Sequence, residues 1–152
     1  MKKWVRFVIA ILICQMAGIV GSLATFSEIK DWYVKLNLPS FTPPNWLFGP
    51  VWLTLYTLMG ISLFWIWEKG LNKKALYIFS FQLFLNALWS FLFFGFHFLF
   101  YSLIEIIILW ITIAITIFMF FKISKKAGLI LLPYIIWVSI ATLLNYYVWI
   151  LN

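Results

Sequence analysis

Hydrophobic residues along this chain form long runs that only a few charged residues interrupt. No Asp, Glu, Lys or Arg occurs within Phe7–Ser27, Leu36–Trp67, Ala75–Ile104, Ile106–Phe121 or Ala127–Asn152. A helix that crosses a bilayer needs about 20 mainly apolar residues, so these runs are long enough to span a membrane. They do not alternate between apolar and polar positions, which argues against a transmembrane β-barrel, the structural alternative.

Two stretches are too long for a single span. Leu36–Trp67 begins with a proline-rich segment, which predicts a loop before the helix. Ala75–Phe121, interrupted only by Glu105, would extend about 70 Å as one helix, more than twice the bilayer core. It must turn back, and Gly95–His97 is the best turn. We therefore predict an all-α integral membrane protein, a single domain over residues 1–152 built as a five-transmembrane-helix bundle, with helices near Val5–Thr25, Trp46–Trp67, Leu76–Phe94, Leu99–Phe121 and Leu129–Trp149.

Composition supports the membrane assignment. Hydrophobic residues make up 66% of the chain and charged residues only 10%, against about 25% charged in an average soluble domain. A soluble domain of 152 residues cannot bury two-thirds of its side chains, and disorder requires low hydrophobicity. Aromatic belts at the membrane interfaces account for part of the 22% aromatic content, but ten Trp residues call for a further explanation.

The basic residues predict the orientation. With five spans the termini lie on opposite sides, and only Lys30 and Lys35 fall on the C-terminal side. The other nine fall on the N-terminal side: Lys2, Lys3, Arg6, Lys69, Lys73, Lys74, Lys122, Lys125 and Lys126. The positive-inside rule then places the N-terminus in the cytoplasm, and a bacterial cytoplasmic membrane is the expected location. The net charge of +7 indicates contact with anionic lipid and gives no argument for nucleic acid.

A polar stripe runs along the third predicted helix. Gln82, Asn86, Trp89 and Ser90 follow the spacing of one helix face, and the two amides offer both donors and acceptors. One interpretation is hydrogen bonding between helices, worth about 0.5–2 kcal/mol per bond. The other is a polar anchor for a ligand. The pattern alone leaves both open.

Three isolated residues are candidates for chemistry. Glu105 is the only carboxylate inside the spans and must be protonated, paired or near water. Proton relay or cation coupling is one role, and a protonated side chain hydrogen-bonded to a helix end is the other. His97 has no second ligand at metal spacing, so no metal site is expected. Cys14 forms no intrachain disulfide and fits a small apolar filler. No motif for hydrolysis or phosphoryl transfer is present.

Aromatic residues lie deeper in the predicted helices than an interfacial belt requires. Trp52 and Tyr56 share one face of the second helix, and Trp137, Ala141 and Asn145 share one face of the fifth. Aromatic rings beside amides predict a pocket for a flat, largely apolar ligand with a few weakly polar groups. Ordinary bundle packing is the alternative.

Small residues on the first predicted helix allow close helix approach. Ala17 and Gly21, with Gly18 and Ser22, follow small-xxx-small spacing, and Gly60 offers a similar contact on the second helix. The approach can occur within the bundle or across a dimer.

These residues belong to a longer ordered pattern. It comprises Trp32-Tyr33 with Leu36 and Pro39; Pro43-Pro44; Pro50-Val51-Trp52 with Leu55-Tyr56 and Met59-Gly60; Gln82, Leu85-Asn86 and Trp89; Phe93-Phe94-Gly95; and Leu132-Pro133-Tyr134, Trp137, Ala141-Thr142 and Leu144-Asn145-Tyr146. With this pattern the chain resembles the translocator protein family, also called tryptophan-rich sensory proteins or peripheral benzodiazepine receptors. The resemblance spans Trp32 to Trp149.

The resemblance implies a five-helix membrane receptor, often a homodimer, with no obligatory cofactor. Its ligands would be protoporphyrin IX, haem-like tetrapyrroles and isoquinoline or benzodiazepine compounds, held under the loop Phe26–Asn45. Light-dependent porphyrin breakdown, reported for some bacterial members, would involve Trp52 and Trp137. The ligand-binding residues carried over are Trp32, Tyr33, Trp52, Tyr56, Gln82, Asn86, Trp89, Trp137 and Ala141.

One departure concerns sterols. The sterol motif of animal members ends with a basic residue, whereas Ala141–Asn152 contains no Lys or Arg, so high-affinity sterol binding is not expected. Three functions were weighed: a tetrapyrrole-binding sensor, a transporter of porphyrins or other lipophilic molecules, and a regulatory partner without a small ligand. The sensor is favoured, with the transporter as the alternative, because five uninterrupted helices lack the repeats and broken helices of secondary transporters.

Overall fold

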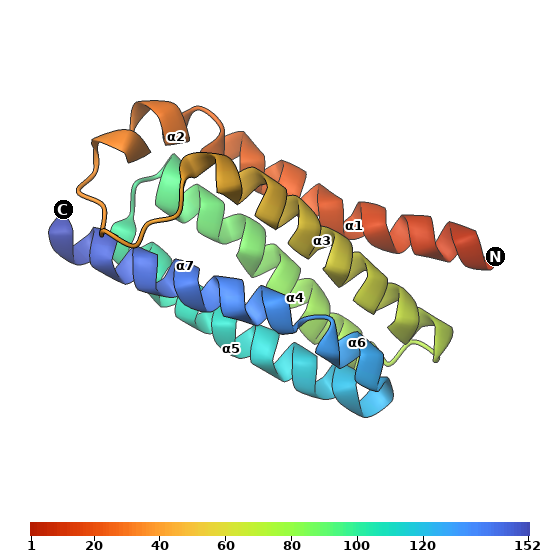
Figure 1. The fold of residues 1–152 in the computed structure, drawn as a ribbon. Coiled ribbons are helices and arrows are strands. Elements are labelled where there is room, and N and C mark those ends of the chain that lie inside the picture. The colour runs from red at the N-terminus through yellow and green to blue at the C-terminus, as the bar shows by residue number, and fades with distance from the viewer.

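Five long helices form a bundle in the computed structural model, which describes residues 1–152 (Figure 1). Each is long and apolar enough to cross a membrane, and there is no β-strand. The predicted all-α bundle of five transmembrane helices is therefore confirmed. The long helices are α1 (Lys3–Thr25), α3 (Asn45–Glu68), α4 (Lys73–Ser90), α5 (Leu99–Ile123) and α7 (Leu132–Leu151); the short elements are α2 (Glu28–Asp31), η1 (Tyr33–Lys35), η2 (Phe91–Gly95) and α6 (Lys125–Leu129).

The structure refines the predicted boundaries. The segment Phe26–Asn45, here called the lid, was predicted as a loop but contains α2 and η1. The predicted fifth span, Leu129–Trp149, corresponds to α7, which begins three residues later at Leu132, with Pro133 in its first turn, and follows the separate short helix α6. The turn between the third and fourth spans lies where it was predicted: α4 continues into the π-helix η2, and His97 takes a left-handed backbone conformation with φ 57°.

The small residues of α1 pack inside one chain. A Cβ atom on Gly18 would lie 2.4 Å from the Tyr56 ring of α3, and one on Gly60 would lie 2.7 Å from the Ile11 backbone of α1. A Cβ on Gly21 would reach the Ser90 hydroxyl of α4 at 3.1 Å. Gly18, Gly21 and Gly60 therefore let α1 approach its neighbours closely.

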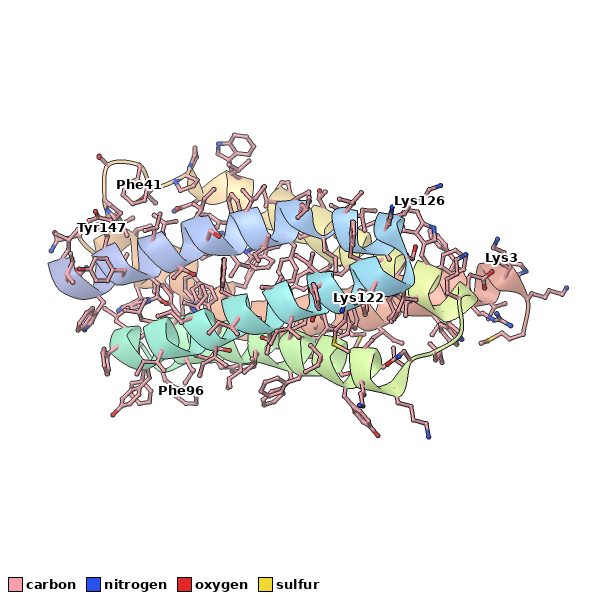
Figure 2. All side chains as sticks on the ribbon, turned by 90° about the horizontal axis from the view of Figure 1, so that it is seen from below. Lys3, Phe41, Phe96, Lys122, Lys126 and Tyr147 are labelled. Carbon is pink, nitrogen blue, oxygen red and sulfur yellow. The ribbon has the colours of Figure 1, made fainter.

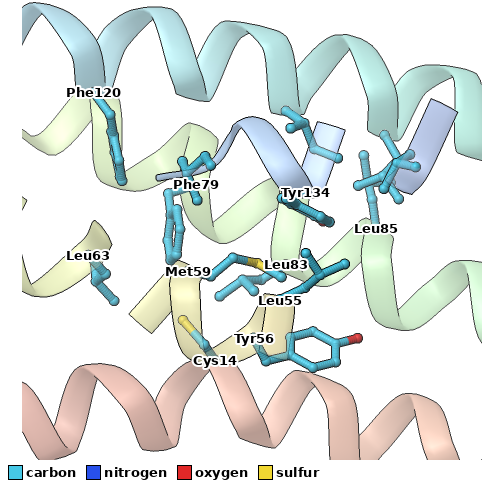
Figure 3. Close-up of a cluster of buried hydrophobic side chains, with 14 of the residues drawn as sticks. Cys14, Leu55, Tyr56, Met59, Leu63, Phe79, Leu83, Leu85, Phe120 and Tyr134 are labelled. Carbon is cyan, nitrogen blue, oxygen red and sulfur yellow. The ribbon is translucent and has the colours of Figure 1, made fainter. Parts of the chain in front are cut away.

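The hydrophobic core lies where the long helices face one another (Figure 3). Phe79 of α4 and Phe120 of α5 stack with ring centroids 5.3 Å apart, and Met59 and Cys14 are fully buried beside them. The inert filler expected of Cys14 matches this place in the core. Many large apolar side chains on the outer faces are exposed, as a helix surface in contact with lipid requires.

The two ends of the bundle differ in the side chains that they carry. Lys3, Lys122 and Lys126 lie toward one end, whereas Phe41 and Tyr147 lie toward the other (Figure 2). The N-terminus shares the first end with α6, and the C-terminus shares the second with the lid (Figure 1). The lid end holds the candidate site.

Candidate ligand-binding cavity at the lid end

A cavity of about 370 Å³ lies between the lid and the long helices α1, α3, α4 and α7. Its volume falls in the range of small-molecule pockets, about 300–1,000 Å³. Fifteen of its 25 lining residues are hydrophobic. The lining comprises Gln15, Gly18, Ile19, Gly21, Ser22, Thr25, Phe26, Ile29, Tyr33, Asn45, Phe48, Gly49, Trp52, Leu53, Tyr56, Asn86, Trp89, Ser90, Phe93, Phe94, Trp137, Ala141, Leu144, Asn145 and Val148.

Two indoles from different helices form part of the wall. Trp52 of α3 stacks on Tyr56, with centroids 5.6 Å apart and planes 28° apart. Trp137 of α7 packs edge-on against Phe48 at 5.8 Å. The Nε1 of Trp137 is buried and has no hydrogen-bond partner in the protein. A buried N–H without a partner is costly, so the Trp137 indole, which lines this mostly apolar cavity, carries a donor that the protein leaves unused.

A hydrogen-bonded chain joins three helices at the deep end of the cavity. The Tyr56 hydroxyl donates to Oδ1 of Asn86, and Nδ2 of Asn86 donates to the Tyr134 hydroxyl at 2.8 Å. The Tyr134 hydroxyl in turn donates to Oε1 of Gln82 at 2.8 Å. The polar stripe of α4 therefore bonds helices together, and only Asn86 of its two amides also faces the cavity.

A second set of hydrogen bonds joins helices beside the cavity. Nε1 of Trp89 donates to Oδ1 of Asn145 at 2.9 Å, and Nδ2 of Asn145 donates to the Leu99 carbonyl at 3.0 Å. Trp89 also stacks on Phe93 of η2 at 5.0 Å. These contacts fix α4, α5 and α7 to one another beside the cavity.

The lid closes over the cavity through Tyr33. Its ring is 5% exposed and packs against Phe94 at 5.7 Å and Phe48 at 6.4 Å. Burial raises the pKa of the Tyr33 hydroxyl to about 12. Tyr33 is thus a neutral, largely apolar surface for whatever the cavity holds.

Two contacts attach the lid to the rest of the bundle. In the first, the Trp32 indole stacks on the His97 ring at 4.0 Å, and Nε2 of His97 lies 3.0 Å from Oε2 of Glu28. In the second, the backbone N–H of Asn37 donates to Oδ1 of Asn152 at 2.9 Å, and Nδ2 of Asn152 donates to the backbone carbonyl of Asn37 at 3.1 Å. The lid is therefore fastened at both α2 and its middle.

Comparison with known proteins decides the family. The profile of the TspO/MBR family matches residues 10–150. The chain belongs to the TspO/MBR family. It is 42% identical over 149 residues to the tryptophan-rich protein TspO of Archaeoglobus fulgidus, with 97% of each chain covered. It is 36% identical over 135 residues to the translocator protein of Homo sapiens, covering 86% of this chain and 80% of the relative. It is 32% identical to the tryptophan-rich sensory protein of Cereibacter sphaeroides over 94% of this chain and 89% of that one.

Membership of the TspO/MBR family together with five apolar helices makes this an integral membrane protein. The structure brings together seven of the nine residues carried over from the family resemblance. These seven all line the cavity: Tyr33, Trp52, Tyr56, Asn86, Trp89, Trp137 and Ala141.

The other two do not line it. Trp32 was expected to contact the ligand, but its ring is engaged with His97 and Phe93 outside the cavity. Gln82 was expected there as well, but it lies one helical turn below Asn86, where it is 1% exposed and bonded to Tyr134. Both residues contact neighbouring side chains and do not form part of the cavity surface.

Sequence reasoning missed the contribution of α1. Gln15, Gly18 and Ser22 all line the cavity. Gln15 also donates to the Leu53 carbonyl at 3.1 Å and to the Thr57 hydroxyl oxygen at 3.0 Å, which ties α1 to α3. The small-residue spacing of α1 signalled a close approach of helices, but nothing in it indicated a cavity wall.

Glu105 stands apart from the site. Its carboxyl is 6% exposed, does not line the cavity, and neither oxygen has a hydrogen-bond partner. The hydrogen bond to a helix end that was one of its two expected roles is absent. No group of three His, Cys, Asp or Glu residues that could hold a metal ion occurs in the chain.

Proposed function

We propose that this protein is a membrane receptor or sensor that binds flat hydrophobic ligands, tetrapyrroles such as protoporphyrin IX and haem-like molecules first among them, in the lid-end cavity. The observation that carries the proposal is the pair of indoles, Trp52 and Trp137, on the wall of a mostly apolar cavity, where Nε1 of Trp137 has no partner in the protein. The name of the Cereibacter sphaeroides relative, a tryptophan-rich sensory protein, supports a sensory role.

The chemistry of the wall suits such a ligand. An extended aromatic ring gains from contact with the faces of Trp52 and Trp137, and a ring nitrogen or carboxylate oxygen can accept from Nε1 of Trp137. An aromatic isoquinoline compound with a carbonyl oxygen meets the same two requirements. The chain has no basic residue in Ala141–Asn152, so the proposal does not extend to sterols.

Light adds a reaction to this binding role. A photoexcited porphyrin is an oxidant, and the indoles of Trp52 and Trp137 are electron-rich groups within the same cavity. Transfer of one electron from an indole would leave an indole radical cation and a porphyrin radical anion. This electron transfer would be the first step of light-dependent porphyrin breakdown, with Trp52 and Trp137 as the photochemical partners.

The proposal also covers the membrane location, orientation and oligomeric state of the protein. Nine of eleven basic residues belong to the end that carries the N-terminus, which supports a cytoplasmic N-terminus in a bacterial cytoplasmic membrane. A homodimer is proposed from the family resemblance, with the apolar outer faces of the helices available for it.

Transport of porphyrins or other lipophilic molecules is the second candidate, and the name of the human relative, translocator protein, favours it. Transport can be tested at Glu105, whose buried carboxyl lies outside the cavity. If the protein transports, Glu105→Gln should abolish flux of a porphyrin into proteoliposomes. Unchanged flux would remove Glu105 from any coupling mechanism.

The binding proposal is tested by titrating the purified protein with protoporphyrin IX and following the porphyrin absorbance. A saturable spectral shift with one ligand per chain is expected. It should be reduced in Trp137→Phe, which keeps an aromatic ring and removes the N–H. A shift that rises linearly without saturation would reject the proposed function.

A further inference from the structure

A second cavity, of about 490 Å³, lies at the opposite end of the bundle from the lid. It is formed where α1 begins, α3 ends and α5 passes into α6 (Figure 1). It shares no residue with the lid-end cavity. Its lining consists of Lys3, Phe64, Trp65, Glu68, Lys69, Ile123, Ser124, Lys125 and Lys126.

The charges of this second cavity are unbalanced. Glu68 is its only acidic residue, and it is already paired with Nη1 of Arg6 at 3.1 Å and Nζ of Lys3 at 3.6 Å. Lys69, Lys125 and Lys126 make no ion pair within the chain. Three exposed lysines therefore line one cavity without an unpaired carboxylate to balance their charge.

The remaining lining is suited to the edge of a membrane. Trp65 and Ile123 are half-buried and Phe64 is buried, and all three lie in the last two turns of membrane-spanning helices. Tryptophan favours the headgroup level of a bilayer. The cavity thus offers both apolar and cationic residues, and the Ser124 hydroxyl, which makes no hydrogen bond in the protein, belongs to a residue of the same lining.

We propose that this cavity binds the headgroup of an anionic phospholipid. The lipid phosphate would lie among Lys69, Lys125 and Lys126, and the start of an acyl chain would lie on Trp65 and Ile123. A basic pocket between membrane helices is the arrangement that recognises acidic headgroups. A soluble phosphate would use only the lysines, whereas the phospholipid also uses the apolar wall. Because Glu68 is already paired with Arg6 and Lys3, the three lysines are left to select for net negative charge.

The experiment compares two triple variants with equal loss of charge at the same end of the bundle. Lys69→Gln, Lys125→Gln and Lys126→Gln remove the cavity lysines, and Lys2→Gln, Lys73→Gln and Lys74→Gln serve as the control, because none of these lines the cavity. Native mass spectrometry counts phosphatidylglycerol and phosphatidylcholine molecules retained by the protein in detergent. We expect the cavity variant to lose about tenfold or more in phosphatidylglycerol affinity, and the control to stay within about twofold.

Several outcomes would overturn the proposal. An equal loss of phosphatidylglycerol affinity in both variants would show that the charged end as a whole attracts lipid. If the unmodified protein retained phosphatidylcholine as well as phosphatidylglycerol, the cavity would not select for an anionic headgroup. If glycerol phosphate bound as tightly as phosphatidylglycerol, the apolar wall would contribute nothing to binding, and the cavity would be a site for soluble phosphate. If the triple variant does not fold, Lys69→Gln alone against Lys73→Gln provides the same comparison. These results do not depend on porphyrin binding.

Discussion

Nδ2 of Asn86 donates a hydrogen bond of 2.8 Å to the hydroxyl of Tyr134, and this bond joins α4 to α7 at the deep end of the lid-end cavity. Asn86 accepts from Tyr56 of α3 at the same time, and Tyr134 donates onward to Gln82. One amide thus connects three helices while it also lines the cavity. The stability of the bundle and the shape of the site depend on the same atoms.

Removal of one hydroxyl tests this connection. Tyr134→Phe leaves Nδ2 of Asn86 and Oε1 of Gln82 without partners in a buried setting, so we expect a loss of about 1–3 kcal/mol in stability. Thermal unfolding in detergent measures it. Tyr101→Phe is the control, because Tyr101 is 62% exposed and its hydroxyl makes no hydrogen bond in the protein. Equal melting temperatures for the two variants would contradict the account.

The close approach of α1 to α3 is tested at a glycine. Gly18→Ala places a Cβ atom 2.4 Å from the Tyr56 ring, which must then move from its place beside Asn86. Overpacking of this kind costs about 1–3 kcal/mol. Gly49→Ala on α3 has no atom within 4 Å of the new Cβ and should be neutral or stabilising by up to about 1 kcal/mol. A Gly18→Ala protein as stable as Gly49→Ala would show that α1 can repack freely.

The fastening of the lid is tested at His97. Asparagine tolerates the left-handed backbone found there, so His97→Asn removes both the ring stack on Trp32 and the contact of Nε2 with Glu28 without adding backbone strain. Loss of a stacked pair worth about 1 kcal/mol should raise the open population of the lid roughly fivefold. Hydrogen exchange of residues 28–36 would report this as faster deuterium uptake. Asp31→Asn, in the same segment but without an ion pair, should exchange like the unmodified protein.

The buried Tyr33 predicts an alkaline loss of stability. Its pKa is raised from 10.0 to about 12, so the folded protein holds this proton more tightly than the unfolded chain does. The resulting stabilisation is complete below pH 10 and is lost as pH rises toward 12, at up to about 1.4 kcal/mol per pH unit. Tyr33→Phe has no such proton. We expect the difference in melting temperature between the two proteins to change across pH 10–12 and to stay constant below pH 9; a constant difference throughout would refute the assignment.

The sequence predicted the spans well because a bilayer imposes a strict rule. Uninterrupted apolar runs of about 20 residues fix where helices lie, and five of them were recognised without any contact information. What the runs do not encode is their ends: Pro133 divides α6 from α7, and η2 extends α4 toward His97. These features depend on local turn geometry.

The site was predicted only as far as its chemistry was visible. Trp52, Asn86 and Trp137 could be chosen because polar and aromatic side chains are distinctive within membrane helices. Gly18 and Ser22 of α1 were missed, because a cavity wall made of small residues looks the same in sequence as a packing surface. Gln82 was chosen for its polarity, but one helical turn separates a residue that lines the cavity from one that supports it.

The photochemical proposal is tested by illumination of the porphyrin complex. If Trp52 and Trp137 supply the electron, the double variant Trp52→Phe, Trp137→Phe should lose most of the light-dependent decrease in porphyrin absorbance at equal occupancy. Trp46→Phe, Trp149→Phe changes two indoles outside the cavity and should bleach the porphyrin at the original rate. Equal bleaching by both double variants would show that the cavity indoles do not take part.

The most direct test of the central claim is the quenching of tryptophan fluorescence by protoporphyrin IX. Ten tryptophans contribute to the signal, and the account assigns the largest ligand-dependent part to Trp52 and Trp137. The account predicts saturable quenching in the unmodified protein and in Trp46→Phe, Trp149→Phe, with a much smaller amplitude in Trp52→Phe, Trp137→Phe. Quenching that does not saturate, or that keeps its full amplitude in the cavity variant, would contradict a porphyrin site in this cavity.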